Sequence, residues 1–331
     1  MKRSLSSFSP AEYRPMAQTE WPTLALLVLC YGLWLAAGLW LYPRLPALAL
    51  IVMGIAVAFH SSLQHEVLHG HPTRSARLNE ALVFLPIGLF YPFRSYKRTH
   101  LQHHLDERLT DPHDDPESYY IALFDWLRLP RLLQLLLRAN NTLLGRVLLG
   151  PPLNVAGFTR AEWKRIARGD ARTRDAWVKH GLGLVPVILL VQFAFGVPIW
   201  LYAGTAGYLG LALLAVRSYC EHQWSESPEG RTIIVERSVL APLFLYNNLH
   251  FVHHKLPRIP WYRLPEVYRH ERADWIRRNG GYVYGSYLEI ARAHALRAKE
   301  PVAHPVLRRD AVWAGDAEFR PRNPLPATHA E

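Results

Sequence analysis

Cysteine is nearly absent from this chain, which limits the kinds of metal or disulfide chemistry it can carry. Only Cys30 and Cys220 occur among its 331 residues, each in or at the end of an apolar run. Two such cysteines cannot build a disulfide framework, a zinc ribbon or an iron–sulfur cluster. The first twenty residues are polar and lack the layout of a cleavable signal peptide. Any metal chemistry must therefore use other side chains.

Charge is missing from long stretches, and these stretches predict helices that cross a membrane. Residues 23–42 form an uncharged run of 20 residues, which as a helix spans the hydrocarbon layer of about 30 Å. Pro43 to Pro46 break this run, and residues 47–63 form a second one. Residues 181–216 are also uncharged, with a turn at 196–198. The pattern predicts two helical hairpins.

The basic residues are distributed unevenly around these hairpins. Half of the residues are hydrophobic and the formal net charge is +11, a mixture that is ordinary for a membrane protein. Of the 38 Lys and Arg residues, only Arg44 lies in one of the two short turns. Because cytoplasmic segments carry the positive charge, both termini are expected in the cytoplasm, at the inner membrane if the protein is bacterial. Burial of these helices in a soluble protein would not explain this asymmetry.

Histidine, in contrast, is abundant and clustered. Residues 100–104 and 250–254 both read H-x-x-H-H, and residues 65–69 read H-E-V-L-H. Spacings of three and four residues place side chains on one face of a helix, so each box is expected to aim its imidazoles at one point. Neutral imidazole is a common ligand of iron, copper, zinc and nickel. The clusters therefore predict a metal site close to the membrane surface.

The number of histidines in such positions predicts two metal ions. One ion rarely binds more than four or five imidazoles, and nine are available here. His222 stands alone, but it follows the fourth apolar segment as His65 and His69 end the second. Because a hairpin followed by histidines occurs twice, two half-sites facing each other are expected. The predicted ligands are His65, His69, His100, His103, His104, His222, His250, His253 and His254.

The other histidines are assigned different places. His60 is either a ligand or part of the surroundings of the site. His71 is expected to point elsewhere on its helix. The isolated histidines are expected on the surface: His113, His180, His270, His294, His304 and His329.

Carboxylates beside the boxes are the natural hydrogen-bond partners of ligating imidazoles, since they fix the tautomer and the ring orientation. Asn247 and Asn248 are expected either to bond a metal-bound water or to cap the helix of the third box. A solvated acidic turn explains some of the carboxylates equally well, and Asp111 and Asp115 are the expected partners among them. The candidates are Glu66, Asp106, Asp111, Asp114, Asp115, Glu117 and Glu221.

The remaining segments are less informative. Residues 121–149 combine leucine runs with arginines, which suits a helix lying in the headgroup plane or one packed on the core. We expect a polar N-terminal segment over residues 1–20, a single domain over 21–300 and a loosely ordered tail over 301–331.

Together these motifs resemble those of the membrane fatty acid desaturase superfamily, the histidine-box di-iron enzymes. The resemblance rests on the three boxes, the two hairpins and His222 after Glu221. The segment 257–265 is similar to that of bacterial members. It implies an all-α integral membrane protein, with four transmembrane helices in two hairpins and a cytoplasmic helical cap that carries the boxes. It also implies two iron ions held by the nine histidines, which act as ligands and catalytic residues, and O2 as co-substrate.

The implied reaction is the introduction of a double bond into a lipid acyl chain within the membrane. Two departures keep a hydroxylase or ketolase of a lipid or carotenoid open as an alternative. Glu66 stands where many acyl-lipid desaturases have Asp and is also seen in alkane monooxygenases. Residues 65–70, followed by Leu78 and Asn79, are similar to carotenoid ketolases.

A non-catalytic metal-binding membrane protein is a further alternative, although a transporter would need ligands across the membrane rather than at one face. The chain contains neither a cytochrome b5 motif nor rubredoxin-type cysteine pairs. Electrons are therefore expected from a separate ferredoxin-like or cytochrome b5-like donor, and no nucleic-acid partner is expected.

Overall fold

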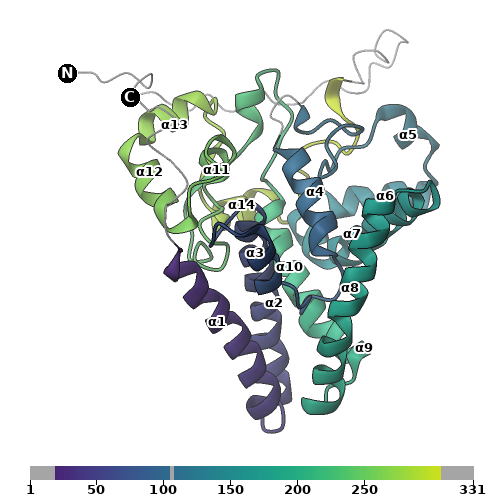
Figure 1. Cartoon of the computed structure of the whole chain (residues 1–331). Helices are drawn as coiled ribbons and strands as arrows, with labels where there is room; N and C mark the ends of the chain where they lie inside the picture. Colours follow the sequence, from purple (N-terminus) through teal and green to yellow (C-terminus); the bar gives the residue numbers. More distant parts are fainter. Residues whose placement is uncertain (1–18, 105–107, 307–331) are drawn as a thin grey trace.

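Two helical hairpins and a broad helical cap make up the molecule (Figure 1). The computed structural model describes residues 19–104 and 108–306. Within these ranges four helices are long and apolar enough to cross a membrane, with mean hydropathy from 1.5 to 2.1. The expected all-α architecture with four membrane helices is confirmed. The spans are Trp21–Leu41, Pro46–Leu68, Ala171–Ala194 and Ile199–Ser218.

The first hairpin follows the predicted pattern closely. Helix α1 (Trp21–Ala36) continues as a π-helical turn over Ala37–Leu41, and α2 (Pro46–Leu68) returns. Proline at the start of α2 suits the first helical turn, where its missing N–H is not needed. Large apolar side chains such as Trp40 are exposed on this hairpin, as expected of a surface that faces lipid.

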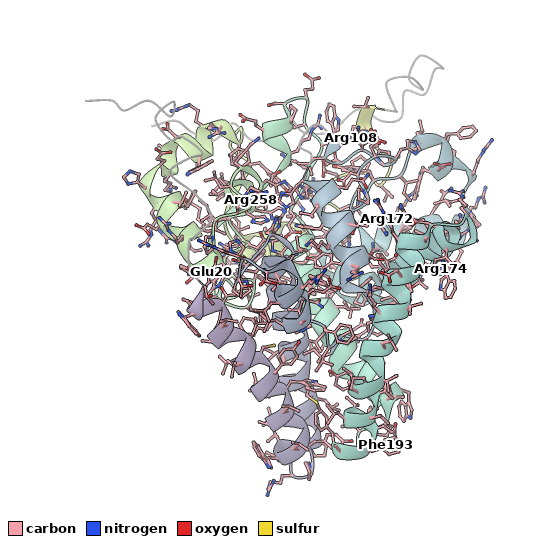
Figure 2. The ribbon with its side chains drawn as sticks, viewed as in Figure 1. Glu20, Arg108, Arg172, Arg174, Phe193 and Arg258 are labelled. Atoms are coloured by element: carbon pink, nitrogen blue, oxygen red, sulfur yellow. The ribbon has the colours of Figure 1, made fainter. Side chains whose placement is uncertain are left out.

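The second hairpin begins earlier than its apolar run suggests. Helix α8 (Ala171–Leu189) starts at Asp170, whose carboxylate accepts from the backbone N–H groups of Arg172 and Thr173. It continues as a π-helical segment (Leu190–Ala194). The return leg consists of α9 (Ile199–Tyr202), a second π-helical segment (Ala203–Gly207) and α10 (Tyr208–Ser218). Figure 2 shows Phe193 at the narrow end and Arg172 and Arg174 at the wide end.

A chain of buried hydrogen bonds joins the hairpins. The indole N–H of Trp34 donates to the hydroxyl of Tyr202 at 2.8 Å, and that hydroxyl donates to the carbonyl of Ile87, also at 2.8 Å. Helices α2 and α10 also approach closely, since a Cβ at Gly210 would lie 2.3 Å from Val57. Only glycine permits this contact.

The rest of the chain forms the helical cap, by which we mean the described elements outside the four spans. Strands β1 (Ile234–Arg237) and β2 (Val283–Ser286) pair in parallel, and short 3₁₀ turns cover Pro228–Arg231 and Trp261–Arg263. The helices are α3 (Ala76–Leu82), α4 (Phe93–His103), α5 (Leu123–Arg128), α6 (Arg131–Asn140), α7 (Leu143–Ala167), α11 (His250–Lys255), α12 (Leu264–His270), α13 (Arg272–Arg278) and α14 (Tyr287–His294).

The leucine-rich region is divided into several helices, and the longest of them was not foreseen. Helix α7 runs for 25 residues and contains Pro151 and Pro152, which break the sequence pattern of a helix. On α6, Leu132 and Leu135 are 70% and 60% exposed. Their exposure favours the membrane-surface alternative for this region over ordinary core packing.

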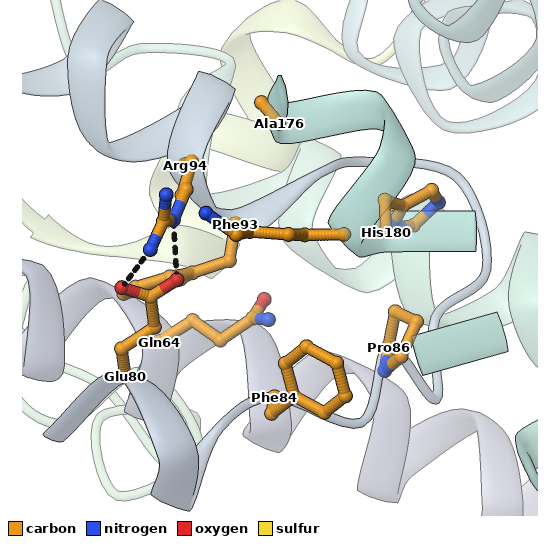
Figure 3. Close-up of a pocket in the computed structure, with 9 residues that line it drawn as sticks. Gln64, Glu80, Phe84, Pro86, Phe93, Arg94, Ala176 and His180 are labelled. Carbon is orange, nitrogen blue, oxygen red and sulfur yellow. Dashed lines mark hydrogen bonds and ion pairs between the residues drawn. The ribbon is translucent and has the colours of Figure 1, made fainter. Parts of the chain in front are cut away.

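Ion pairs fix α4, which carries the second box, against its neighbours (Figure 3). Arg94 on α4 bonds Glu80 on α3 and Asp175 on α8. Beside them, the imidazole of His180 donates to the carbonyl of Leu89 at 2.8 Å. The expectation that His180 lies on the surface is wrong, because α4 and the preceding loop cover it.

Hydrogen bonds to the rest of the structure continue past residue 300, where the loosely ordered tail was expected to begin. Ile121 donates to the carbonyl of Val302, and His304 donates back to Ile121. His304 is buried against Tyr120, so its expected surface position is wrong as well. The remainder of the expected tail, with His329, lies outside the described residues.

Candidate metal centre

The nine predicted ligands come together in two groups. Within each group one nitrogen of every imidazole lies within 4.8 Å of the others. They are supplied by the C-terminal ends of α2 and α4, the segment after α10, and α11. The five-histidine group is His65, His69, His100, His104 and His253, and the four-histidine group is His103, His222, His250 and His254.

Each H-x-x-H-H box is shared between the two groups. His100 and His104 belong to the five-histidine group, whereas His103 belongs to the four-histidine group; the third box is divided in the same way. The expectation that each box aims at one point is therefore wrong for the two H-x-x-H-H boxes, whereas His65 and His69 do share one group. Successive residues of a helix point about 100° apart around its axis. The two adjacent histidines of a box can therefore face sites on different sides of the helix.

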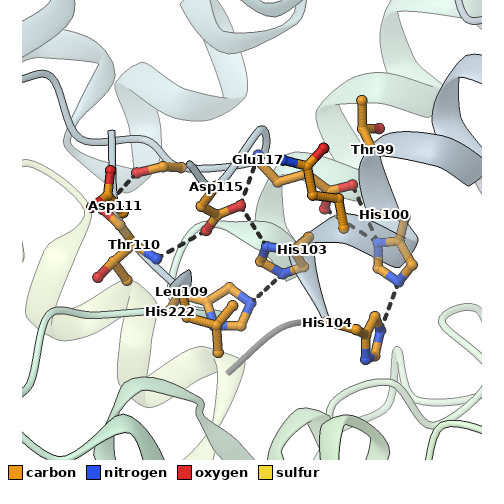
Figure 4. Close-up of polar contacts among 12 residues, drawn as sticks. Thr99, His100, His103, His104, Leu109, Thr110, Asp111, Asp115, Glu117 and His222 are labelled. Atoms are coloured by element: carbon orange, nitrogen blue, oxygen red, sulfur yellow. Dashed lines mark hydrogen bonds and ion pairs between the residues drawn. The ribbon is translucent and has the colours of Figure 1, made fainter. Parts of the chain in front are cut away.

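Hydrogen bonds at Nδ1 orient three of the imidazoles, and Figure 4 shows those of His100 and His103. His103 donates to Asp115 at 2.8 Å, and His100 donates to Glu117 at 3.2 Å. His250 donates to the side-chain oxygen of Asn247 at 3.0 Å. With the proton on Nδ1, each neutral ring presents the lone pair of Nε2 to the site.

The Nε2 atoms lie at spacings that a shared cation would explain. Nε2 of His222 is 2.9 Å from that of His103 and 3.1 Å from that of His250. Two imidazoles bound to one ion at about 2.1 Å and at right angles have nitrogens about 3.0 Å apart. Facing lone pairs repel without a cation between them. The residues therefore fit a metal ion.

The five-histidine group fits for a similar reason. Nε2 of His104 lies 3.0 Å from Nε2 of His100. The Nε2 atoms of His65, His69 and His253 are buried and have no hydrogen-bond partner among the described residues. Buried polar atoms are normally paired, so these nitrogens indicate a missing ligand.

Burial keeps most of these rings in the neutral, metal-binding form. Loss of solvent lowers the pKa of His222, His250 and His254 well below the usual value. His103 differs: burial alone lowers its pKa, but the carboxylates of Glu117 and Asp115 raise it to about 9. Asp115 would hold its Nδ1 proton once Nε2 binds a cation.

Only some of the candidate partner residues form hydrogen bonds with the histidines. Asp115 and Glu117 bond imidazoles, whereas Asp111 accepts the backbone N–H groups of His113 and Asp114 and so belongs to an acidic turn. Asn247 bonds His250, while Asn248 donates to the carbonyl of Val235.

The other carboxylates contact different groups. Glu221 pairs with Arg217 at 2.8 Å, and Glu66 accepts the backbone N–H of Trp261 at 3.0 Å. Asp106 lies outside the described residues.

Two uncertain histidines lie apart from both groups. His60 is hydrogen-bonded to the hydroxyl of Tyr31 at 2.9 Å. His71 lies in a third cluster, with Glu20 and Glu66. Sequence reasoning missed this cluster because Glu20 and His71 are 51 positions apart, and no local spacing links them.

A large cavity reaches the four-histidine group. Its volume is about 570 Å³, against about 20 Å³ for the pocket of Figure 3, and it lies between α2, α4, α7 and α10. Such a volume suits a small-molecule or lipid ligand. Its wall includes His60, Gln64, Tyr91, Gly157, Leu214 and His222.

Comparison with known families agrees with this site. The model of the fatty acid desaturase family matches residues 42–286, a stretch that contains all nine histidines. The chain belongs to the fatty acid desaturase family. A search of curated proteins found no match to this chain. Membership supports a lipid-modifying membrane oxidoreductase with a metal-dependent site.

Proposed function

We propose that the protein is an O2-dependent di-iron oxidoreductase that introduces a double bond into a lipid acyl chain in the membrane. The observation that carries the proposal is the convergence of nine imidazoles in two groups, one of which lines the 570 Å³ cavity through His222. No amino-acid side chain can oxidise a saturated carbon chain. Bound irons would supply that oxidising power.

The residues of the chain would bind and orient these components. The nine histidines hold the metals, and Asp115, Glu117 and Asn247 fix the direction of three rings. The cavity wall combines apolar residues such as Val57 and Leu214 with polar ones such as Gln64. The acyl chain would lie along this wall, which would exclude water from the reacting carbon.

The orientation of the chain in the membrane is part of the proposal. The cap and both termini would be cytoplasmic, and Arg44 would lie on the opposite side, as the distribution of basic residues favours. A basic cap would attract an acidic electron donor. Reporter fusions at Asp115 and at Arg44 should give opposite locations, and a cytoplasmic Arg44 would contradict this orientation.

Product analysis tests the reaction. Lipids from a host that expresses the protein with a competent electron donor should contain a new double bond, which disappears with His103→Ala or His253→Ala. His270→Ala, an exposed histidine, is the matched control and should keep the activity. A new hydroxyl or keto group would assign the chain to the hydroxylase or ketolase alternative. Absence of any product in air would refute an oxidative reaction.

Metal analysis separates the enzyme from a metal transporter. The enzyme should hold two irons, with O2-dependent turnover, whereas a transporter should hold one exchangeable ion. The position of the nine histidines near one end of the spans supports the enzyme, because a transporter needs ligands along its path.

A further inference from the structure

A third buried cluster of potential ligands lies outside the nine histidines. Glu20 precedes α1, Glu66 is in the last turn of α2 and His71 follows that helix. Their exposed fractions are only 5%, 5% and 6%, and one ligand atom of each lies within 4.8 Å of the others. Charged groups are rarely so deeply buried unless they are paired or bind a metal.

The orientation of His71 is that of a metal ligand. Its Nδ1 donates to Glu20 at 2.6 Å, and a carboxylate at this position commonly orients a metal-binding imidazole. Its Nε2 is buried without a hydrogen-bond partner in the described part of the chain. That atom lies 3.8 Å from Oε1 of Glu66, which is too long for a hydrogen bond. Two ligand bonds of about 2.1 Å that meet at about 130° would span this distance.

The surrounding groups also favour a cation. Carboxylates in a site with little solvent carry negative charge that is costly without compensation. A bound cation would compensate it, and so would a proton on His71, whose pKa is raised because the effect of burial is outweighed by Glu66 and Glu20. The hydroxyl of Tyr262 is buried and unpartnered within the described residues. Burial raises the pKa of Tyr262, and the charges of Glu20 and Glu66 raise it further.

We propose that His71 and Glu66 ligate one divalent first-row cation, separate from the two ions of the histidine groups, while Glu20 holds the Nδ1 proton of His71. Zinc fits this mixture of one nitrogen and carboxylate oxygens. The segment after the third box contacts the same region, because Trp261 donates its backbone N–H to Glu66 and its indole N–H to Thr23. The ion would hold this segment against the start of α1 and the end of α2.

Counting metals in the full-length protein tests the site. The protein is purified in detergent after growth with added zinc and iron, and total first-row metal per chain is measured by mass spectrometry. Wild type should hold three ions, and both His71→Ala and Glu20→Gln should hold two. His270→Ala, an exposed histidine, should keep three. A single elution peak in detergent verifies that each variant is folded.

The outcomes separate this site from the di-iron proposal. A wild-type count of two that neither variant lowers would overturn the site and leave an ion triad of Glu20, His71 and Glu66 only. A count of one that His71→Ala abolishes would support the site while contradicting two metals in the histidine groups. His253→Ala should lower the count while the zinc that depends on His71 remains. Should His71→Ala fail to fold, the wild-type count and Glu20→Gln decide.

Discussion

The two histidine groups differ in the number of imidazoles and in their access to the large cavity. In the four-histidine group, Asp115 and Asn247 orient His103 and His250, and His222 faces the large cavity. The five-histidine group has one more ring, Glu117 orients His100 there, and none of its five histidines lines that cavity. A metal with fewer protein ligands keeps a position open. Under the proposed function, the substrate-facing ion would therefore bind in the four-histidine group and the more saturated ion in the other.

Removing one ligand from each group tests this difference most directly. His222→Ala leaves three imidazoles in its group, so we expect loss of one of the two ions and a fall in activity of about 100-fold or more. His104→Ala leaves four, so both ions should remain although activity falls. Metal content and product formation measure the two effects. Equal metal loss in both variants would remove the basis of the comparison.

The carboxylate partners should give the next largest effect. Asp115→Asn weakens the hold on the His103 proton, and we expect about a 10- to 100-fold loss of metal affinity or activity. Asp111→Asn is the matched control, because Asp111 accepts only backbone N–H groups in the contacts described above. Chelator titration of each variant measures affinity. Equal losses would show that the acidic turn, and not the His103 contact, is what matters.

A change in the cavity should alter substrate use without altering either ion. A Cβ at Gly157 would meet nothing within 4 Å, so Gly157→Leu projects a side chain into the cavity. We expect a loss of kcat/KM for long acyl chains of about tenfold, with unchanged metal content. Gly181→Leu, at an equally open helical glycine outside the cavity, should leave chain-length preference as it is. A preference that shifts equally in both variants would argue against the cavity.

An ion pair remote from both groups sets the lower end of the scale. The hydrogen bond from Arg272, with that from Tyr268, lowers the pKa of Glu236. The ionised carboxylate therefore stabilises the fold above its ordinary pKa of 4.5, and this stability is lost as pH falls. Arg272→Ala should lower the free energy of unfolding by less than about 1 kcal/mol at pH 7 and by nothing at acidic pH. Thermal unfolding of metal-free protein in detergent measures this change. A loss well above about 1 kcal/mol would mean that this exposed pair contributes more to the stability of the cap than surface ion pairs usually do.

The sequence predicted the spans and the nine histidines because both depend on local patterns. Uncharged runs marked the spans, and spacings of three and four residues marked the boxes. It did not predict that His103 and His100 serve different groups, since this depends on which partners the two sides of α4 meet. It also missed α7, where two prolines interrupt the pattern, and the contact of Glu20 with His71 across a whole hairpin. These features are set by tertiary contacts rather than by neighbours in the chain.

The hydrogen bond between Trp34 and Tyr202 also constrains the order in which the protein can be made. The donor lies 168 positions before its acceptor, so the first hairpin leaves the ribosome long before its partner exists. Until then an indole N–H in the middle of a span has no protein partner from the fourth span, and hydrocarbon offers none. This contact therefore forms only once the fourth span is present. A chain that stops before Tyr202 would leave the indole N–H without this partner in the bilayer.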